Sequence, residues 1–147
     1  MKISLGCDHG GFNLKEKIKR YLIDKGYEVI DKGTHSLDSV DYPKYGQLVA
    51  NSVVNKESDL GIIFCGTGIG ISIAANKIKG IRAALCSNTT MARLSRQHND
   101  ANILALGERI TGEILAIDIV DTFINTKFEG GRHAKRVSEI ECNCDLF

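Results

Sequence analysis

Short apolar runs alternate with longer amphipathic stretches along the chain, and this alternation constrains the fold more than any other feature. The expected strands are residues 3–7, 27–31, 60–65, 81–86 and 102–106. The expected helices are residues 12–25, 43–56, 66–79, 90–98 and 111–125, followed by an amphipathic segment over 132–140. Strands that are separated by helices form parallel crossovers, with helices on both faces of one sheet. The sequence therefore predicts a single three-layer α/β/α domain over residues 1–147, built on a doubly wound, five-stranded parallel sheet.

Local signals support these ranges. Leu14, Ile18 and Leu22 recur at four-residue spacing, which places one apolar stripe on the helix expected over 12–25, and Gly26 is a natural stop. Pro43 suits the first turn of the next helix. The continuous apolar run 60–65 is typical of a central parallel strand that is covered on both faces.

Charge and composition exclude several function classes. The 147 residues include 19 Lys and Arg against 18 Asp and Glu, a net charge of +1, which argues against a broad electrostatic nucleic-acid binder. Apolar stretches such as 114–117 fall far short of the roughly 20 residues of a membrane helix, and the N-terminus carries no secretion signal. The odd number of cysteines then indicates free thiols in a reducing cytoplasm: Cys7, Cys65, Cys86, Cys142 and Cys144.

The C-terminal residues carry two motifs that we dismiss. The last four residues, from Cys144 to Phe147, superficially resemble a prenylation box, but Asp145 is not aliphatic and no polybasic run precedes the motif. Cys142 and Cys144 form a C-x-C pair without a second ligand pair at zinc spacing. The sequence therefore predicts neither a lipid anchor nor a metal site.

A glycine-rich loop, GTGIG over residues 66–70, follows the central apolar strand. Ligands of open parallel sheets bind beyond the carboxyl ends of the strands. Backbone N–H groups at a glycine-rich helix start can stabilise a phosphate or a developing oxyanion. The loop is no dinucleotide fingerprint, because Ile71 stands where the third glycine is required, and no Gly-Lys-Ser/Thr makes it a P-loop. A tight turn that only permits close packing stays open as the alternative.

Cys65 lies directly before this loop. The helix start and the neighbouring amides can stabilise a thiolate there, which could act as a base or a nucleophile. A phosphatase is excluded because Ile71 occupies the position where its arginine would stand. The alternative is a small buried hydrophobic residue at the end of a core strand, and this is what we expect of Cys7 and Cys86.

Two histidines accompany polar residues at element ends. Asp8 and His9 follow the first strand at the same edge of the sheet as the glycine loop, where a histidine could bind phosphate or exchange protons. His98 and Asn99 end a helix, where capping or plain solvent exposure is the alternative.

The only dense basic run is residues 132–136. Arg132 and Arg136 are four residues apart and share one helix face, a geometry that suits a dianionic phosphate. A solvated surface helix is the alternative. Arg109, after the fifth strand, is a further candidate.

Together these motifs resemble the type B ribose-5-phosphate isomerase family, which includes the galactose-6-phosphate isomerase subunits. The resemblance covers nearly the whole chain. Its longest block is CGTGIGISIAANK over residues 65–77, and the other blocks are residues 6–9 with Gly11, 41–43, 80–83, 95–100 and 129–133.

The resemblance implies a Rossmann-like sheet and a cofactor-free aldose–ketose isomerase of the pentose phosphate pathway. Such an enzyme interconverts D-ribose 5-phosphate and D-ribulose 5-phosphate through an enediolate. It also implies a homodimer or homotetramer whose active sites are completed by two subunits. The alternatives are an isomerase of a six-carbon sugar phosphate, galactose 6-phosphate or allose 6-phosphate, and a sensor that binds a sugar phosphate without turnover.

The same resemblance implies a role for each candidate residue. Cys65 would be the base that moves the proton between C2 and C1, Thr67 would assist at the sugar oxygens, and His98 would open the furanose ring. Asp8 and Asn99 would bind substrate hydroxyls. The enediolate oxygens would be held by the amides of the loop, from Gly66, Thr67, Gly68, Ile69 and Gly70. Phosphate and substrate contacts would come from His9, Arg109, Arg132 and Arg136.

Overall fold

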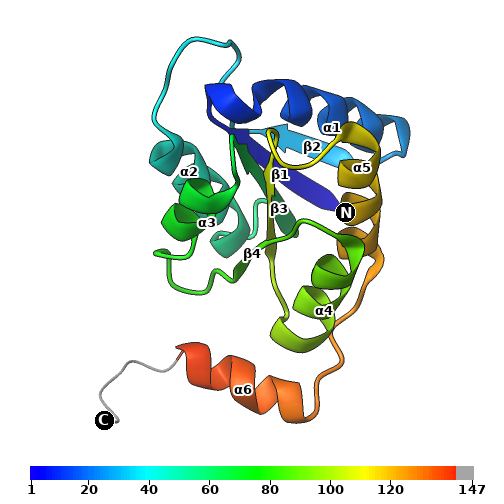
Figure 1. The fold of residues 1–147 in the computed structure, drawn as a ribbon. Helices are drawn as coiled ribbons and strands as arrows, with labels where there is room; N and C mark the ends of the chain where they lie inside the picture. Colours follow the sequence, from blue (N-terminus) through cyan, green and yellow to red (C-terminus); the bar gives the residue numbers. More distant parts are fainter. Residues whose placement is uncertain (142–147) are drawn as a thin grey trace.

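Five parallel strands form one sheet in the computed structural model, which describes residues 1–141 (Figure 1). The strands are β1 (Lys2–Cys7), β2 (Glu28–Asp31), β3 (Leu60–Cys65), β4 (Ala83–Leu85) and β5 (Ile103–Gly107). Their order across the sheet is β2-β1-β3-β5-β4, and every pairing is parallel. The chain thus winds outward in both directions from β1 and β3, which confirms the predicted doubly wound, Rossmann-like α/β fold.

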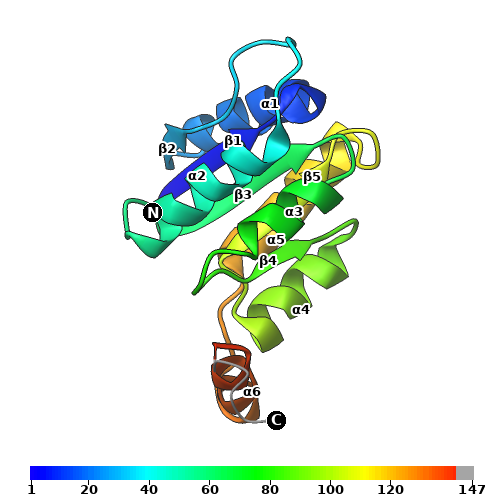
Figure 2. The ribbon, with the colours of Figure 1, turned by 90° about the vertical axis from the view of Figure 1, so that its left-hand side faces the viewer.

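Helices cover both faces of this sheet (Figure 2). The helices are α1 (Phe12–Asp24), α2 (Tyr42–Val54), α3 (Ile69–Ala75), α4 (Thr89–Asn99), α5 (Glu113–Asn125) and α6 (Arg132–Glu141), with a short 3-10 turn over His9–Gly11. Helices α2 and α3 pack on one face, and α1, α4 and α5 pack on the other. Helix α6 extends beyond the end of the sheet and contacts α4 (Figure 1). None of the helices in residues 1–141 has the length and apolar character needed to span a bilayer.

Two elements are at least three residues shorter than the sequence predicts, whereas the other bounds differ by at most two residues. Helix α3 was expected over 66–79 but begins only after Gly68, whose φ of 79° is not helical, and ends before Asn76. The Asn76 side chain accepts a hydrogen bond from the N–H of Ala83 and donates one to its carbonyl oxygen. This side chain therefore ends the helix and occupies the free edge of β4, which spans three residues where 81–86 was predicted. The C-terminal cysteine motifs lie outside the described residues.

Alternation along β3 decides where the candidate base points. Successive side chains of a strand face opposite sides of the sheet. Phe64 packs with the core beneath α1 and α5, whereas Ile63 and Cys65 pack with the core beneath α2 and α3. The Cys65 thiol is therefore on the face where α3 begins.

A fully buried lysine, which sequence reasoning missed, fixes one side of the fold. The Lys15 side chain has no exposed surface, and its ammonium lies 2.9 Å from Asp31, 2.8 Å from Glu16 and 3.1 Å from the carbonyl of Thr34. Burial lowers the pKa of Lys15, but the hydrogen bonds to Glu16 and Asp31 raise it by more. The lysine is therefore charged, and it ties α1 to the end of β2 and the following loop.

The Lys15–Asp31 pair generates a stability prediction. Asp31→Asn removes the more buried of the two carboxylates that face the Lys15 ammonium, so we expect the free energy of unfolding to fall by about 3 kcal/mol. Urea denaturation at pH 7 measures this change. The matched control is Glu28→Gln, which breaks the exposed Lys2–Glu28 pair and should change stability by less than about 1 kcal/mol. Equal effects of the two substitutions would contradict the prediction.

The Lys15–Asp31 pair also predicts how this stability difference changes with pH. Burial raises the pKa of Asp31, but hydrogen bonds from Lys19, Lys15 and the Gly33 amide outweigh it, so the net shift is downward from 3.8. A carboxylate with a depressed pKa stabilises the fold above its unfolded pKa and loses this effect as the pH falls through the folded pKa. The difference between wild type and Asp31→Asn should therefore shrink below about pH 4.

Candidate active site

The loops that follow β1, β3 and β5 meet at one edge of the sheet. The Asp8 N–H donates to the carbonyl of Phe64 at the end of β3, and a Cβ on Gly10 would lie 3.1 Å from the amide nitrogen of Gly66. We call the residues gathered here the sheet-edge site: Asp8, His9, residues 65–70 and Arg109. The site is thus formed by three loops that the parallel register brings together.

Cys65 ends β3 beneath the glycine loop. Its side chain is 5% exposed, and its Sγ accepts a hydrogen bond of 3.1 Å from the N–H of Gly68. A sulfur accepts such a bond better as a thiolate than as a thiol, because the negative charge faces the amide dipole. Two residues further along the loop, Oγ1 of the exposed Thr67 accepts a 3.2 Å bond from the N–H of Ile69. The loop thus places a thiol and a hydroxyl next to backbone donors.

The other two described cysteines lack this environment. Cys7 ends β1 and is 0% exposed, and Cys86 directly follows β4 and is 2% exposed. Burial raises the pKa of Cys7 to about 12 and that of Cys86 to about 11, so both stay protonated at neutral pH. The prediction that these two thiols are small buried core residues is confirmed.

Arg109 lies over the glycine loop. The N–H groups of Glu108 and Arg109 donate to the carbonyls of Cys65 and Gly66, both at 3.0 Å, which fixes the loop after β5 against the loop after β3. A Cβ on Gly66 would lie 3.3 Å from the guanidinium carbon of Arg109. A permanent positive charge therefore sits where the glycine loop could hold an anion.

Asp8 and His9 are fixed by backbone contacts. The Asp8 side chain is buried, and its Oδ1 accepts a 2.9 Å bond from the N–H of Gly10. Nδ1 of His9 lies 3.1 Å from the backbone nitrogen and 3.3 Å from the carbonyl oxygen of Val40, so the Val40 backbone holds this edge of the ring. Both side chains are therefore oriented before a ligand arrives.

Tyr42 belongs to this region but was not among the candidate residues. A Cβ on Gly70 would lie 2.6 Å from the Tyr42 ring, so the ring rests on the end of the glycine loop. The side chain is 40% exposed. Its only signal in the sequence is its place in the Asp41-Tyr42-Pro43 block of the family resemblance.

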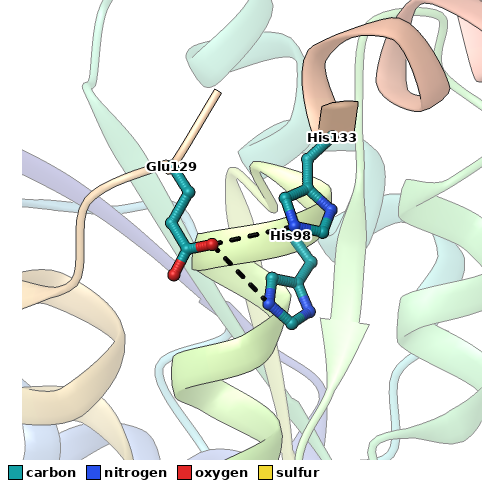
Figure 3. A group of neighbouring side chains, drawn as sticks. All are labelled: His98, Glu129 and His133. Carbon is teal, nitrogen blue, oxygen red and sulfur yellow. Dashed lines mark ion pairs between the residues drawn. The ribbon is translucent and has the colours of Figure 1, made fainter. Parts of the chain in front are cut away.

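The remaining candidates gather at a second location, between the end of α4 and the start of α6. The rings of His98 and His133 are stacked, with centroids 4.2 Å apart and planes 10° apart (Figure 3). Glu129 Oε2 lies 3.9 Å from Nε2 of His98 and 3.7 Å from Nε2 of His133. We call these three residues the α4–α6 cluster. Beside it are the exposed side chains of Asn99, Arg132 and Arg136.

The α4–α6 cluster and the sheet-edge site lie at opposite edges of the sheet. Arg82, which directly precedes β4, donates from Nε to the carbonyl of Asn99 at 2.9 Å, so α4 ends where the strands begin. Cys65 stands at the other end, four residues along from the Gly61–Ile103 pairing. At about 3.3 Å per residue, these edges are roughly 13 Å apart. One chain therefore does not bring all of the predicted site residues together.

The donor atoms of the α4–α6 cluster lie within 4.8 Å of one another, a spacing that could hold a metal ion. Imidazole binds metals through a nitrogen lone pair that lies in the ring plane. Because the two rings are stacked in nearly parallel planes, their Nε2 lone pairs run side by side and do not converge on one ion. The geometry fits a packed side-chain cluster better than a metal centre.

An apolar cavity of about 270 Å³ adjoins the glycine loop. Thr67 and Ile69 line it from the loop, and the other sides are lined by Leu85 at the end of β4, Met91 in the first turn of α4 and Ile110 after β5. Ile69 and Ile110 are 52% and 63% exposed. Exposed apolar surface of this kind beside a polar site is typical of protein–protein contact.

Comparisons with known proteins identify close relatives. The family model described as Ribose/Galactose Isomerase matches residues 3–140. The chain is 55% identical over 139 residues to ribose-5-phosphate isomerase B of Escherichia coli K12, with 95% of this chain and 93% of that protein covered. Ribose-5-phosphate isomerase B of Clostridium thermocellum matches with a TM-score of 0.95 and 62% identity, covering 96% and 95% of the two chains. The Thermotoga maritima enzyme matches with a TM-score of 0.94 and 56% identity, covering 95% and 97%.

The contact between the β3 and β5 loops generates a prediction. A Cβ on Gly107 would lie 2.5 Å from the carbonyl carbon and oxygen of Thr67, so Gly107→Ala must displace the glycine loop. We expect this change to lower the free energy of unfolding by about 1–3 kcal/mol. The control is Gly112→Ala, where a Cβ meets nothing within 4 Å. Urea denaturation of both variants checks the prediction, and matching midpoints would contradict it.

Proposed function

The chain belongs to the ribose/galactose isomerase family, and we propose from its site that it interconverts D-ribose 5-phosphate and D-ribulose 5-phosphate. One observation carries the proposal. Cys65 is the only described cysteine that stands at a loop of backbone donors, with its Sγ bonded to the Gly68 amide and the guanidinium of Arg109 over the same loop. A thiolate, backbone donors and a cation in one place can together remove a proton next to a carbonyl in an anionic substrate.

The chemistry requires one base and a stabilised oxyanion. The Cys65 thiolate takes the proton from C2 of the open aldose, and the C2–H electron pair forms the C1–C2 double bond of an enediolate. The thiol then returns the proton to C1, while the O2 hydroxyl loses its proton and C2 becomes the ketone carbonyl. The electron pair stays within the sugar throughout. Each well-placed donor of the 66–70 loop stabilises the enediolate by roughly 3–4 kcal/mol.

The other side chains of the sheet-edge site transfer protons and bind the substrate. Thr67, two residues after Cys65, has a hydroxyl that can relay protons between O1 and O2. Asp8 accepts from a substrate hydroxyl, because only its Oδ1 is engaged with Gly10. His9 and Arg109 contribute donors to the substrate and its phosphate, and Tyr42 borders the pocket at Gly70.

A second copy of the chain completes the site in this proposal. His98, Asn99, Arg132 and Arg136 lie at the far edge of their own sheet, so they serve the sheet-edge site of a partner. A two-fold axis makes this exchange reciprocal, with two identical sites per dimer. The exposed apolar rim of Ile69, Met91 and Ile110 supports contact with a partner next to the glycine loop.

Within this shared site, the roles follow the chemistry of each group. Arg132 and Arg136, one helical turn apart on α6, grip the substrate phosphate, and its binding energy positions the reacting carbons. Asn99 binds a sugar hydroxyl. His98 opens the furanose ring before Cys65 acts.

The family description favours one second candidate, a six-carbon sugar phosphate. The same catalytic groups serve both sugars, and only the length of the pocket differs. Steady-state kinetics on ribose 5-phosphate, galactose 6-phosphate and allose 6-phosphate separate them. We expect the highest kcat/KM for the pentose. We also propose a cytoplasmic location, which the free thiols of Cys7, Cys65 and Cys86 support.

Cys65→Ala tests the base. Removing the thiol should lower kcat by about 10²–10⁴-fold, the range of general base catalysis, while ribose 5-phosphate binding stays measurable by calorimetry. The matched control is Cys86→Ala, which removes a buried, protonated thiol directly after β4 and should keep turnover close to wild type. Full turnover in Cys65→Ala would rule out the thiolate as the base.

Subunit mixing tests the shared site. Cys65→Ala and His98→Asn should each be nearly inactive alone. After refolding an equal mixture, half of the dimers are mixed, and each mixed dimer has one intact site. Activity should therefore recover to about one quarter of wild type. If every site used residues of a single chain, the mixture would show no recovery.

A further inference from the structure

The α4–α6 cluster contains two residues with no role in the proposed reaction, Glu129 and His133. His133 is 7% exposed and stands in the first turn of α6, with its ring parallel to that of the half-buried His98. Glu129 faces both rings through one carboxylate oxygen (Figure 3). The half-buried His98 therefore has a flat buried neighbour on one side and a negative charge near its Nε2.

The backbone around these two residues is built to hold them against α4. The N–H of Glu129 donates to the carbonyl of Gln97 at 3.1 Å, and the N–H of His133 donates to the carbonyl of Gly130 at 3.1 Å. Gly130 and Gly131 have φ angles of 67° and 55°, a left-handed pair that side chains disfavour. This sharp turn lets residues 129 and 133 approach His98 together.

We infer that His133 and Glu129 are positioning residues that hold His98 in the orientation and tautomer needed to open the sugar ring. This inference rests on the function proposed for His98. The stacked His133 ring fixes the plane of His98. The Glu129 carboxylate, at ion-pair distance, favours a proton on the Nε2 that faces it, and this leaves the lone pair of the other nitrogen, Nδ1, for the substrate.

His98 alone can carry out both proton transfers that ring opening requires. Nδ1 takes the proton of the anomeric hydroxyl O1 as the C1–O4 bond breaks and the C1 carbonyl forms. The same nitrogen returns that proton to O4. The transient imidazolium keeps its Nε2–H toward Glu129, so the charge forms next to a carboxylate.

The surroundings of His133 favour its neutral form. Burial, the neighbouring His98 and Arg132 lower the pKa of His133, with a smaller effect of Arg136, while Glu129 acts in the opposite direction. His133 is therefore neutral at neutral pH. Two stacked imidazolium rings would repel each other, so a neutral His133 lets the transient charge form on His98.

The test isolates ring opening from proton transfer. In the Cys65→Ala background, the protein should still exchange the two furanose anomers of ribose 5-phosphate, because anomer exchange needs only ring opening. Exchange NMR spectroscopy measures this rate. Adding His98→Asn should abolish the catalysed exchange. Adding His133→Ala should lower it by about 10- to 100-fold, the effect of a misplaced catalytic group, and Glu129→Ala should act in the same direction.

Two further variants separate positioning from structure. His133→Phe keeps a flat ring beneath His98 and should restore most of the exchange rate. Lys135→Ala, an exposed residue of the same helix, should leave it unchanged. If His133→Ala merely loosened α6, ribose 5-phosphate affinity would fall through Arg132 and Arg136, whereas positioning leaves the calorimetric affinity in place.

The outcomes distinguish this inference from the proposed function. If Cys65→Ala does not catalyse anomer exchange, or if the exchange persists after His98→Asn is added, the ring-opening role of His98 is wrong. The positioning role of His133 and Glu129 is then wrong as well. If His98→Asn abolishes exchange but His133→Ala does not change it, only the positioning is overturned. A loss in His133→Ala that follows substrate affinity and is not rescued by His133→Phe also overturns the positioning.

Discussion

The structure depends on the close approach of three loops at the carboxyl ends of β1, β3 and β5. A Cβ on Gly10 would make a tight 3.1 Å contact with the Gly66 nitrogen, and Gly107 lies so close to the Thr67 carbonyl that a side chain has no room. These contacts hold the glycine loop in place beneath Arg109 and set the Gly68 amide over Cys65. The glycines thus do more than permit tight turns. They allow backbone groups from three parallel strands to share one small volume, where an anion can meet several donors at once.

The same topology that builds this edge separates it from half of the predicted site. A helix that follows a strand in a parallel sheet returns to the edge where strands begin, so α4 carries His98 and Asn99 away from Cys65. Helix α6 then packs on the end of α4 and is anchored again by Glu141, which binds Arg82 at 2.8 Å and the Gly80 amide at 3.2 Å. In the proposed function, a single chain therefore presents two partial sites, and a two-fold arrangement is the simplest way to join them.

The sequence predicted what depends on local order and missed what depends on tertiary contacts. The strand over 60–65, the helix after Pro43 and the glycine loop behind Cys65 follow from periodicity and turn chemistry, and all were confirmed. The buried state of Lys15 was not predictable, because its partner Asp31 is 16 residues away and a lysine usually lies at the surface. Helix α3 was predicted too long, because no residue near Asn76 in the sequence indicates that its side chain bonds to β4. The Glu129–His133 contacts with His98 likewise arise only when α6 folds back onto α4.

In the proposed shared site, the position of α6 also determines which length of sugar phosphate can bind. Cys65 acts at C1 and C2 from one copy, while Arg132 and Arg136 hold the phosphate from the other, so the sugar spans the boundary between two chains. The length of sugar that fits is then set by how Glu141 anchors α6 to Arg82 and to the Gly80 amide, and not by the groups that move protons. One helix therefore carries both the ring that positions His98 and the arginines that grip the phosphate. Any shift of α6 changes ring opening and phosphate binding together, which couples recognition of the sugar's length to the first chemical step.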